Sequence, residues 1–214
     1  IKKLEKNNNR EWFEVNKLEF KRIETEVKHF GQQLKESLEA SEHIDGVKLF
    51  RVYRDVRFSK DKTPYKTHFG ISMHREKPRH RGGYFVQLKP NENFAAVGFW
   101  DPNKEDLLRI RKELELDSSE LRELMEELNF KKTWGKLEGN ELKTSPKGFS
   151  KEDPNIDLIR KKMFVFRKKY SDKEVLGPNF LKQLAQDFRT VRPFLDYMSS
   201  VLTTDLNGVS LLDK

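Results

Sequence analysis

Cysteine is absent from the 214 residues of this chain. Its absence excludes disulfide bonds, thiolate nucleophiles and zinc sites that contain cysteine ligands. A folded state without disulfides suits a reducing compartment. We therefore expect a cytoplasmic protein.

Long apolar runs are missing as well. No window approaches the roughly 18 to 20 uncharged apolar residues of a membrane-spanning helix, and no apolar run follows a basic start as in a signal peptide. We predict no membrane partner. The apolar fraction is only 35%, but sixteen phenylalanines and three tryptophans supply large side chains for a core. The length fits one domain, residues 1–214, that buries about 70% of its extended-chain surface.

Several motifs of known chemistry are also absent. The chain has no P-loop, no Gly-x-Gly-x-x-Gly after a strand, no His-Glu-x-x-His helix and no Gly-x-Ser-x-Gly elbow. His68, His74 and His80 are spaced six residues apart, and six residues of strand span about 20 Å, too far for ligands of one zinc ion. We predict no metal site and no cofactor. Whether the chain is an enzyme stays open.

The pattern of apolar residues predicts an α+β fold with a mainly antiparallel sheet of about five strands. Asn9 is a good N-cap for a long N-terminal helix, in which apolar residues recur every three, four or seven positions as far as Ala40. Short strands with short connections indicate an antiparallel meander. We expect strands at residues 47–53, 67–74, 84–88, 94–99 and 163–167, a central helix pair at 107–114 and 121–128, irregular chain at 130–150, and a C-terminal helix that begins at Pro178 and is kinked at Pro193.

Positive charge is concentrated in one part of the chain. Residues 51–89 contain eleven Lys or Arg and three Asp or Glu, a net charge of +8 that equals the net charge of the whole chain. Residues 104–128 have nine acidic and five basic side chains. A confined basic region attracts anionic partners such as phosphate esters, nucleic acids or acidic proteins.

The densest part of this region runs from Arg51 to His68. Guanidinium groups contact carboxylates and phosphates with two parallel hydrogen bonds. Asp55 and Asp61 are placed to orient two of the arginines, which leaves at least one guanidinium and the lysines for an anion. The alternative is an internal ion-pair network that fixes an irregular loop, with Asp61 in an Asx-turn and Pro64 setting the exit. The predicted ligand-binding residues are Arg51, Arg54, Arg57, Lys60, Lys62 and Lys66.

Three functions compete at this segment. The leading hypothesis is the binding of a phosphate-bearing or other anionic small molecule. For an enzyme, the candidate catalytic residues are His68, Tyr65 and Asp55, and His68 is foremost because its reference pKa is about 6.5. The second hypothesis is a nucleic-acid-binding module in which Tyr65 or Tyr84 stacks on bases. The third is a protein-interaction domain that pairs its basic loop with its acidic helices in a dimer; the sequence leaves the oligomeric state open.

A family resemblance covers nearly the whole chain. Arg51, Arg54-Asp55, Arg57-Phe58, Asp61-Lys62 and Tyr65 match every fixed position of the pattern R-x-x-R-D-x-R-F-x-x-x-[DN]-K-x-x-Y. With Asn8 to Phe13 upstream and Pro146 to Phe149 downstream, the chain resembles the uncharacterised bacterial and fungal family known as domain of unknown function 2461. It departs from many members at residues 151–154, where Lys-Glu-Asp-Pro replaces an Asp-His-Pro wording. The resemblance implies a single α+β domain, and it transfers no activity and no catalytic residues.

Overall fold

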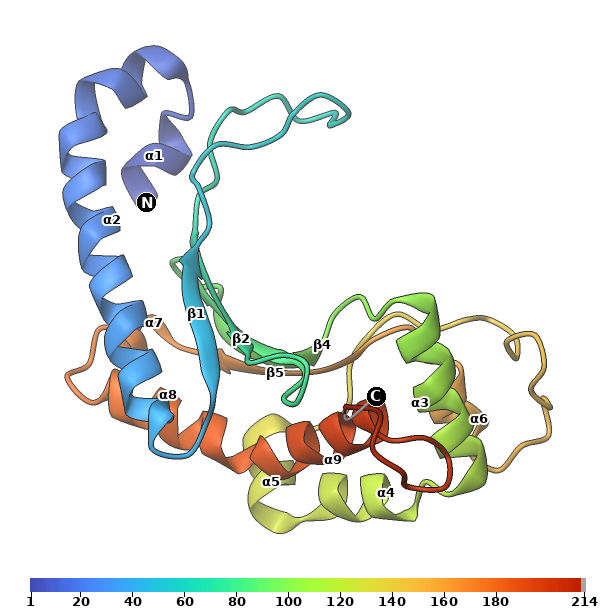
Figure 1. Cartoon of the computed structure of the whole chain (residues 1–214). Coiled ribbons are helices and arrows are strands. Elements are labelled where there is room, and N and C mark those ends of the chain that lie inside the picture. The colour runs from blue at the N-terminus through green and yellow to red at the C-terminus, as the bar shows by residue number, and fades with distance from the viewer. Residues whose placement is uncertain (213–214) are drawn as a thin grey trace.

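A computed structural model of the chain describes residues 1–212 and confirms the α+β fold (Figure 1). Five antiparallel strands form one sheet, and the helices surround it on one side and at one end. The strands are β1 (Ile44–Leu49), β2 (Phe69–Arg75), β3 (Gly83–Leu88), β4 (Asn93–Phe99) and β5 (Phe164–Tyr170). The helices are α1 (Lys2–Lys6), α2 (Arg10–Glu39), α3 (Lys104–Leu116), α4 (Ser119–Glu126), α5 (Leu128–Trp134), α6 (Ile156–Ile159), α7 (Asp172–Val175), α8 (Phe180–Thr190) and α9 (Arg192–Thr203).

The sheet is the predicted meander, with strand order β1-β2-β3-β4-β5. Alternate residues of each strand point to the same face, so the register decides which side chains share the core. Met73 pairs with Tyr84, Tyr84 with Val97, and Val97 with Phe166. All four side chains are fully buried. This face of the sheet is therefore the floor of the main hydrophobic core.

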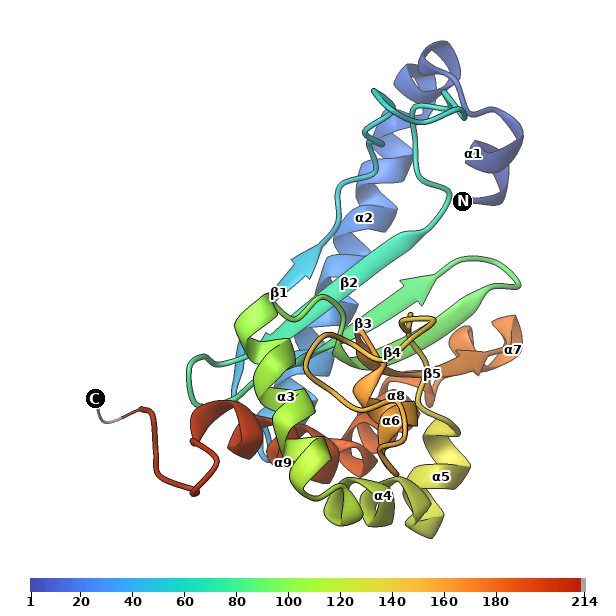
Figure 2. The same ribbon diagram turned by 90° about the vertical axis from the view of Figure 1, so that its right-hand side faces the viewer.

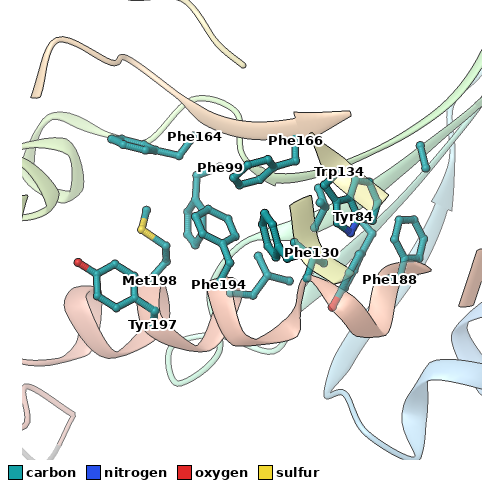
Figure 3. Packing of buried hydrophobic residues seen from close by; sticks show 14 of the residues in the cluster. Tyr84, Phe99, Phe130, Trp134, Phe164, Phe166, Phe188, Phe194, Tyr197 and Met198 are labelled. Atoms are coloured by element: carbon teal, nitrogen blue, oxygen red, sulfur yellow. The ribbon is translucent and has the colours of Figure 1, made fainter. Parts of the chain in front are cut away.

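Aromatic rings fill the space between the sheet and the helices (Figure 3). The Phe166 ring on β5 meets Phe194 of α9 edge to face, with ring centroids 5.0 Å apart, and Phe130 of α5 in the same way at 4.8 Å. Such edge-to-face pairs are favoured by the ring quadrupoles. The prediction of irregular chain at residues 130–150 was wrong for its first five residues, which belong to helix α5. Glu127 caps α5 by accepting a hydrogen bond from the Phe130 backbone N–H at 2.7 Å.

The N-terminal helix matches its prediction closely. The Asn9 side chain accepts a hydrogen bond from the Trp12 backbone N–H at 2.9 Å, which makes it the N-cap of α2. A helix of this length spans about 45 Å. Its C-terminal half packs Leu34 and Leu38 into the main core. Its first turns pack into a separate small cluster, the arm core, which consists of Leu4, Phe13, Val52 and Tyr65.

The C-terminal helix differs from its prediction. The chain forms two helices, α8 and α9, that meet at Val191. Pro193 lies in the first turn of α9. The backbone N–H groups of a first turn have no partner within the helix, so proline costs no helix hydrogen bond there. Pro178 precedes Asn179, the N-cap of α8, and so lies outside the helix. Within residues 1–212, no helix combines the length and the apolar character that crossing a membrane requires.

Among residues 1–212, no helix packs on the second face of the sheet. Helices α2, α8 and α9 follow the convex side of the curved sheet, and the concave side opens away from them (Figure 1). Figure 2 looks onto this side, with β2 and β3 visible between the chain at the top of the view and α3. We call it the open sheet face. Its residues, taken from the strand register, include Lys48, Gly70, Ser72, His74, Phe85, Gln87, Phe94, Ala96, Arg167 and Lys169, with Phe50 just beyond β1.

Candidate functional site

The basic segment predicted as the site, residues 51–68, forms an arm that projects from the sheet between β1 and β2 (Figure 1). Its two sides pair loosely across a bridge between Tyr53 and Tyr65. The Tyr65 ring stacks on Phe13 with centroids 4.0 Å apart. The Asn8 side chain donates to the Tyr65 carbonyl at 2.9 Å and accepts from its N–H at 3.1 Å. The start of α2 therefore holds the base of the arm.

Arg54 is used within the arm. Its guanidinium forms an ion pair with Asp61 and donates to the Thr63 carbonyl at 3.1 Å. Asp61 also accepts the Thr63 backbone N–H at 2.9 Å, which is the Asx-turn considered from the sequence. These contacts close the tip of the arm. Arg54 and Asp61 therefore have a structural role in the tip, and little of the Arg54 charge remains for a ligand.

Arg57 and Lys62 are also bonded within the arm, but they stay exposed. Arg57 makes a two-pronged contact with Asp55, at 3.0 Å from Nε and 2.6 Å from Nη2. Its side chain is nonetheless 77% exposed. The Lys62 ammonium donates to the Val56 carbonyl at 2.9 Å, which leaves its charge without a carboxylate. Arg54 and Arg57 are thus each paired with an aspartate of the arm, as the hypothesis of an internal ion-pair network requires.

Arg51, Lys60 and Lys66 carry charge without a carboxylate partner. Among residues 1–212, the side chains of Arg51 and Lys60 make no hydrogen bond or ion pair. Lys66 donates to the Arg51 carbonyl at 3.0 Å, and its ammonium lies 5.5 Å from the centre of the Phe50 ring. Partial burial and the nearby Arg51 charge both lower the pKa of Lys66. Two cations are therefore held close together where the arm joins the sheet.

The three catalytic candidates lie in different surroundings. Tyr65 is 4% exposed and belongs to the arm core, and burial raises its pKa. Asp55 is bound by Arg57, and that hydrogen bond lowers its pKa. His68 is half-buried, and burial followed by the Lys66 charge lowers its pKa, so its imidazole is neutral at pH 7. These groups do not form a connected set for proton transfer.

The tyrosines proposed for base stacking are buried. Tyr84 is fully buried in the main core, and Tyr65 is buried in the arm core. Tyr53, on the other side of the bridge, is 45% exposed. The expectation that Tyr65 or Tyr84 stacks on bases was therefore wrong, because strand alternation turns Tyr84 toward the helices and Tyr65 packs on Phe13.

The open sheet face supplies aromatic side chains that the sequence prediction missed. Phe50, Phe85 and Phe94 lie next to one another on it, with centroids 6.0 Å apart for the first pair and 5.8 Å for the second. We call these residues the phenylalanine strip. A signal was present: Tyr84-Phe85-Val86 places large apolar residues on both faces of one strand, whereas a half-solvated strand normally alternates with polar ones.

Two pockets are lined by residues outside the arm. A largely apolar pocket of about 520 Å³ lies between α1, the start of α2, the β3–β4 turn and α7, and is lined by residues such as Trp12, Phe20 and Leu176. A smaller hollow is lined by His43, His80 and the residues between β2 and β3. Neither includes a basic residue of the arm. Within the described chain, no three His, Asp or Glu side chains are grouped to hold a metal ion.

The tip of the arm is expected to open at acid pH. Hydrogen bonds from the Thr63 N–H and from Arg54 lower the pKa of Asp61 from 3.8 to about 2. Because the folded pKa is lowered, this contribution to stability is present above pH 3.8 and is lost as pH falls toward 2. The Thr63 amide resonance followed by NMR should titrate in that range. Asp61→Asn should abolish the transition, and a midpoint at the ordinary value of 3.8 would contradict it.

Comparison with known proteins gives one match. The model of a family described as conserved hypothetical protein (DUF2461) matches residues 1–197, which include every strand and the whole arm. No curated protein and no solved structure matches the chain.

Proposed function

Because the chain belongs to the DUF2461 family of conserved hypothetical proteins, whose description names no activity, we propose a function from the chemistry of its arm. The arm binds the phosphate backbone of a nucleic acid. Six basic and two acidic side chains lie within residues 51–68. Phosphate contacts from Lys and Arg supply most of the non-specific affinity of proteins for nucleic acids.

The observation that carries this proposal is the pair of cations at the base of the arm. The Lys66 ammonium donates to the Arg51 carbonyl at 3.0 Å, and burial followed by the Arg51 charge lowers the pKa of Lys66. Among residues 1–212, no carboxylate forms an ion pair with either side chain. Like charges held together in this way repel one another. A phosphate bound to both relieves the repulsion, so its binding is stronger than to either cation alone.

The tip extends the same charge along the arm. Arg57 is mostly exposed, although it shares its charge with Asp55, and Lys60 is exposed and unpaired among the described residues. The Arg54–Asp61 pair fixes the shape of the tip and is not itself a phosphate contact. The cations are thus spread along an extended segment, as a chain of phosphates requires.

A polymer fits this arrangement better than a small anion does. Small-molecule sites are concave and bury most of the ligand surface. The basic residues of the arm line neither the apolar pocket near α1 nor the hollow near His80. A nucleic acid needs no pocket, because its charges repeat along its length.

The test is a measurement of affinity against salt concentration. Fluorescence anisotropy with a labelled oligonucleotide of roughly 20 nucleotides should show binding at about 50 mM salt that weakens strongly by about 200 mM. The double variant Arg51→Ala, Lys66→Ala should lower the slope of log affinity against log salt by about 1.4, because each lost phosphate contact on a single strand removes about 0.7.

The matched control removes two charges elsewhere. Lys132 on α5 and Lys182 on α8 are exposed and lie on helices packed against the other side of the sheet. Lys132→Ala, Lys182→Ala should leave the slope unchanged. An equal loss in both double variants would contradict a site at the arm. If inorganic phosphate or a mononucleotide binds saturably and the oligonucleotide does not, the ligand of the arm is a small anion and not a nucleic acid.

A further inference from the structure

The phenylalanine strip crosses the open sheet face from the end of β1 to β4. The Phe50 and Phe85 rings are tilted by 54° to each other, and the Phe85 and Phe94 rings by 43°. Phe50 is 38% exposed, and Phe85 and Phe94 are half-buried. In the described part of the chain no helix packs over this face (Figure 2), and the partial exposure of the three rings means that they meet solvent.

Gly70 leaves room for two rings of the strip. It occupies β2 between Phe50 and Phe85, and a Cβ atom there would lie 3.2 Å from both rings. Ser72 and Ala96, the neighbours of Phe85 across β2 and β4, are also small. These small residues leave the three rings as the largest apolar side chains on this part of the open sheet face.

Basic side chains lie at both ends of the strip. The Lys48 and Lys66 ammonium groups are 5.6 and 5.5 Å from the centre of the Phe50 ring. At the other end the Arg167 guanidinium lies 4.6 Å from the centre of the Phe94 ring. Arg167 also contacts Glu138 at 3.6 Å, so its charge is partly compensated. Lys66 belongs to the arm, which makes the strip continuous with the proposed phosphate site.

We propose that the open sheet face is the base-stacking half of the same site, so that the partner is a single-stranded nucleic acid. The inference rests on the proposed function and names its substrate class. Phosphates contact the Arg51–Lys66 pair, and consecutive bases stack on Phe50, Phe85 and Phe94. Sheets whose exposed aromatics stack two or three bases are an established solution to single-strand recognition.

Single strands are favoured because the strip presents partly exposed aromatic rings. In a duplex, the bases stack on each other, and a protein reaches only their edges in the grooves. Stacking on a protein side chain therefore requires unpaired bases, and it tolerates any sequence because every base has a π face. Stacking on phenylalanine reads no base edge, so we expect little sequence preference.

The test separates base contacts from backbone contacts. Affinity is measured for a single-stranded oligonucleotide, for an abasic oligonucleotide of the same length and for a duplex. Phe85→Leu and Phe94→Leu keep apolar volume but remove the ring. Each should weaken the base-bearing strand by about 5-fold to 150-fold, the equivalent of one lost stacking contact. Neither should change affinity for the abasic strand, and the duplex should bind more weakly than the single strand.

Phe58→Leu is the matched control, because Phe58 lies at the arm tip and is 98% exposed. It should leave binding of all three ligands unchanged. If base-bearing and abasic strands bind equally and the strip variants have no effect, the stacking inference fails while phosphate binding stands. If no oligonucleotide binds, the proposed function itself fails. A loss confined to Phe58→Leu would place the base contacts on the arm and overturn the strip.

Discussion

Gly98→Ala is expected to destabilise the protein by at least about 4 kcal/mol, in the range reserved for severe backbone and core defects. Gly98 on β4 has a φ of +131°, a conformation that side chains rarely adopt. A Cβ atom there would also lie 2.0 Å from the Phe164 carbonyl oxygen on β5. Relief requires β4 and β5 to separate, and their pairing carries Phe166 into the core. Urea denaturation followed by tryptophan fluorescence measures the loss.

Gly135→Ala is the control for conformation alone. Gly135 follows α5 with a φ of +70°, and nothing lies within 4 Å of a Cβ built on it. Its replacement should cost only about 1 to 3 kcal/mol, the strain of a sparsely populated backbone region with ψ of −130°. Equal losses at both positions would show that backbone strain, and not the contact with β5, dominates at Gly98.

Arg75→Met is expected to cost about 3 to 5 kcal/mol, because it removes the buried partner of the Glu42 carboxylate and leaves it the partly exposed Arg192 at 3.7 Å. The Arg75 side chain is 1% exposed, and Glu42, bound at 2.8 Å, has no exposed side-chain surface. Arg75 also pairs with Asp196 and donates to Ser199 at 3.3 Å, both on α9. One guanidinium thus connects β2, the segment before β1 and α9. Urea denaturation again measures the change.

Two comparisons make this result specific. Arg22→Met breaks an exposed pair with Glu26 on α2, where both side chains are more than 60% exposed, and should cost only about 0.3 to 0.5 kcal/mol. The double variant Glu42→Leu, Arg75→Met removes both buried charges and should recover most of the loss. A double variant as unstable as Arg75→Met alone would show that packing, and not the orphaned charge, causes the defect.

The pH dependence of Arg75→Met gives an independent readout. Burial already raises the pKa of Glu42 above its usual 4.5, and Arg75 opposes that shift. Removing Arg75 therefore raises the pKa of Glu42 in the folded state further, and the folded state holds the Glu42 proton still more tightly than the unfolded state does. Stability therefore falls as pH rises from 4.5 through the raised pKa, and the variant should lose more stability over this interval than the parent protein.

The sequence predicted the sheet and its helices because alternation and periodicity are local properties. Asn9 as a cap and the strand at residues 67–74 were correct for this reason. α5 was missed because seven residues are too few for a helical period to stand out. The break between α8 and α9 was read as a kink, since one apolar stripe runs through both helices.

The site was harder to predict because its features depend on tertiary placement. Spacing alone suggested that two aspartates orient two arginines, but it did not tell which guanidinium stays free. Arg51 is free because the arm folds Asp55 and Asp61 toward its tip. The Tyr84-Phe85-Val86 run signals an apolar residue on the second face of one strand, but whether a helix covers that face is set by distant segments. That Phe50, Phe85 and Phe94 lie next to one another on it follows from the register of three strands, which the sequence pattern does not give.

The arm core is separate from the main core, and this gives the molecule two levels of local stability. Only four buried residues, together with Trp12 and Phe20, hold the arm against α1 and the start of α2. A cluster of this size opens at a lower free energy than the whole fold. Amide hydrogens of the arm and of the first turns of α2 should exchange with solvent long before those of β2 to β5. A ligand held by Arg51 and Lys66 of the arm and by Phe85 and Phe94 of the sheet would bridge the less stable part to the more stable one, so that binding is also a local folding step.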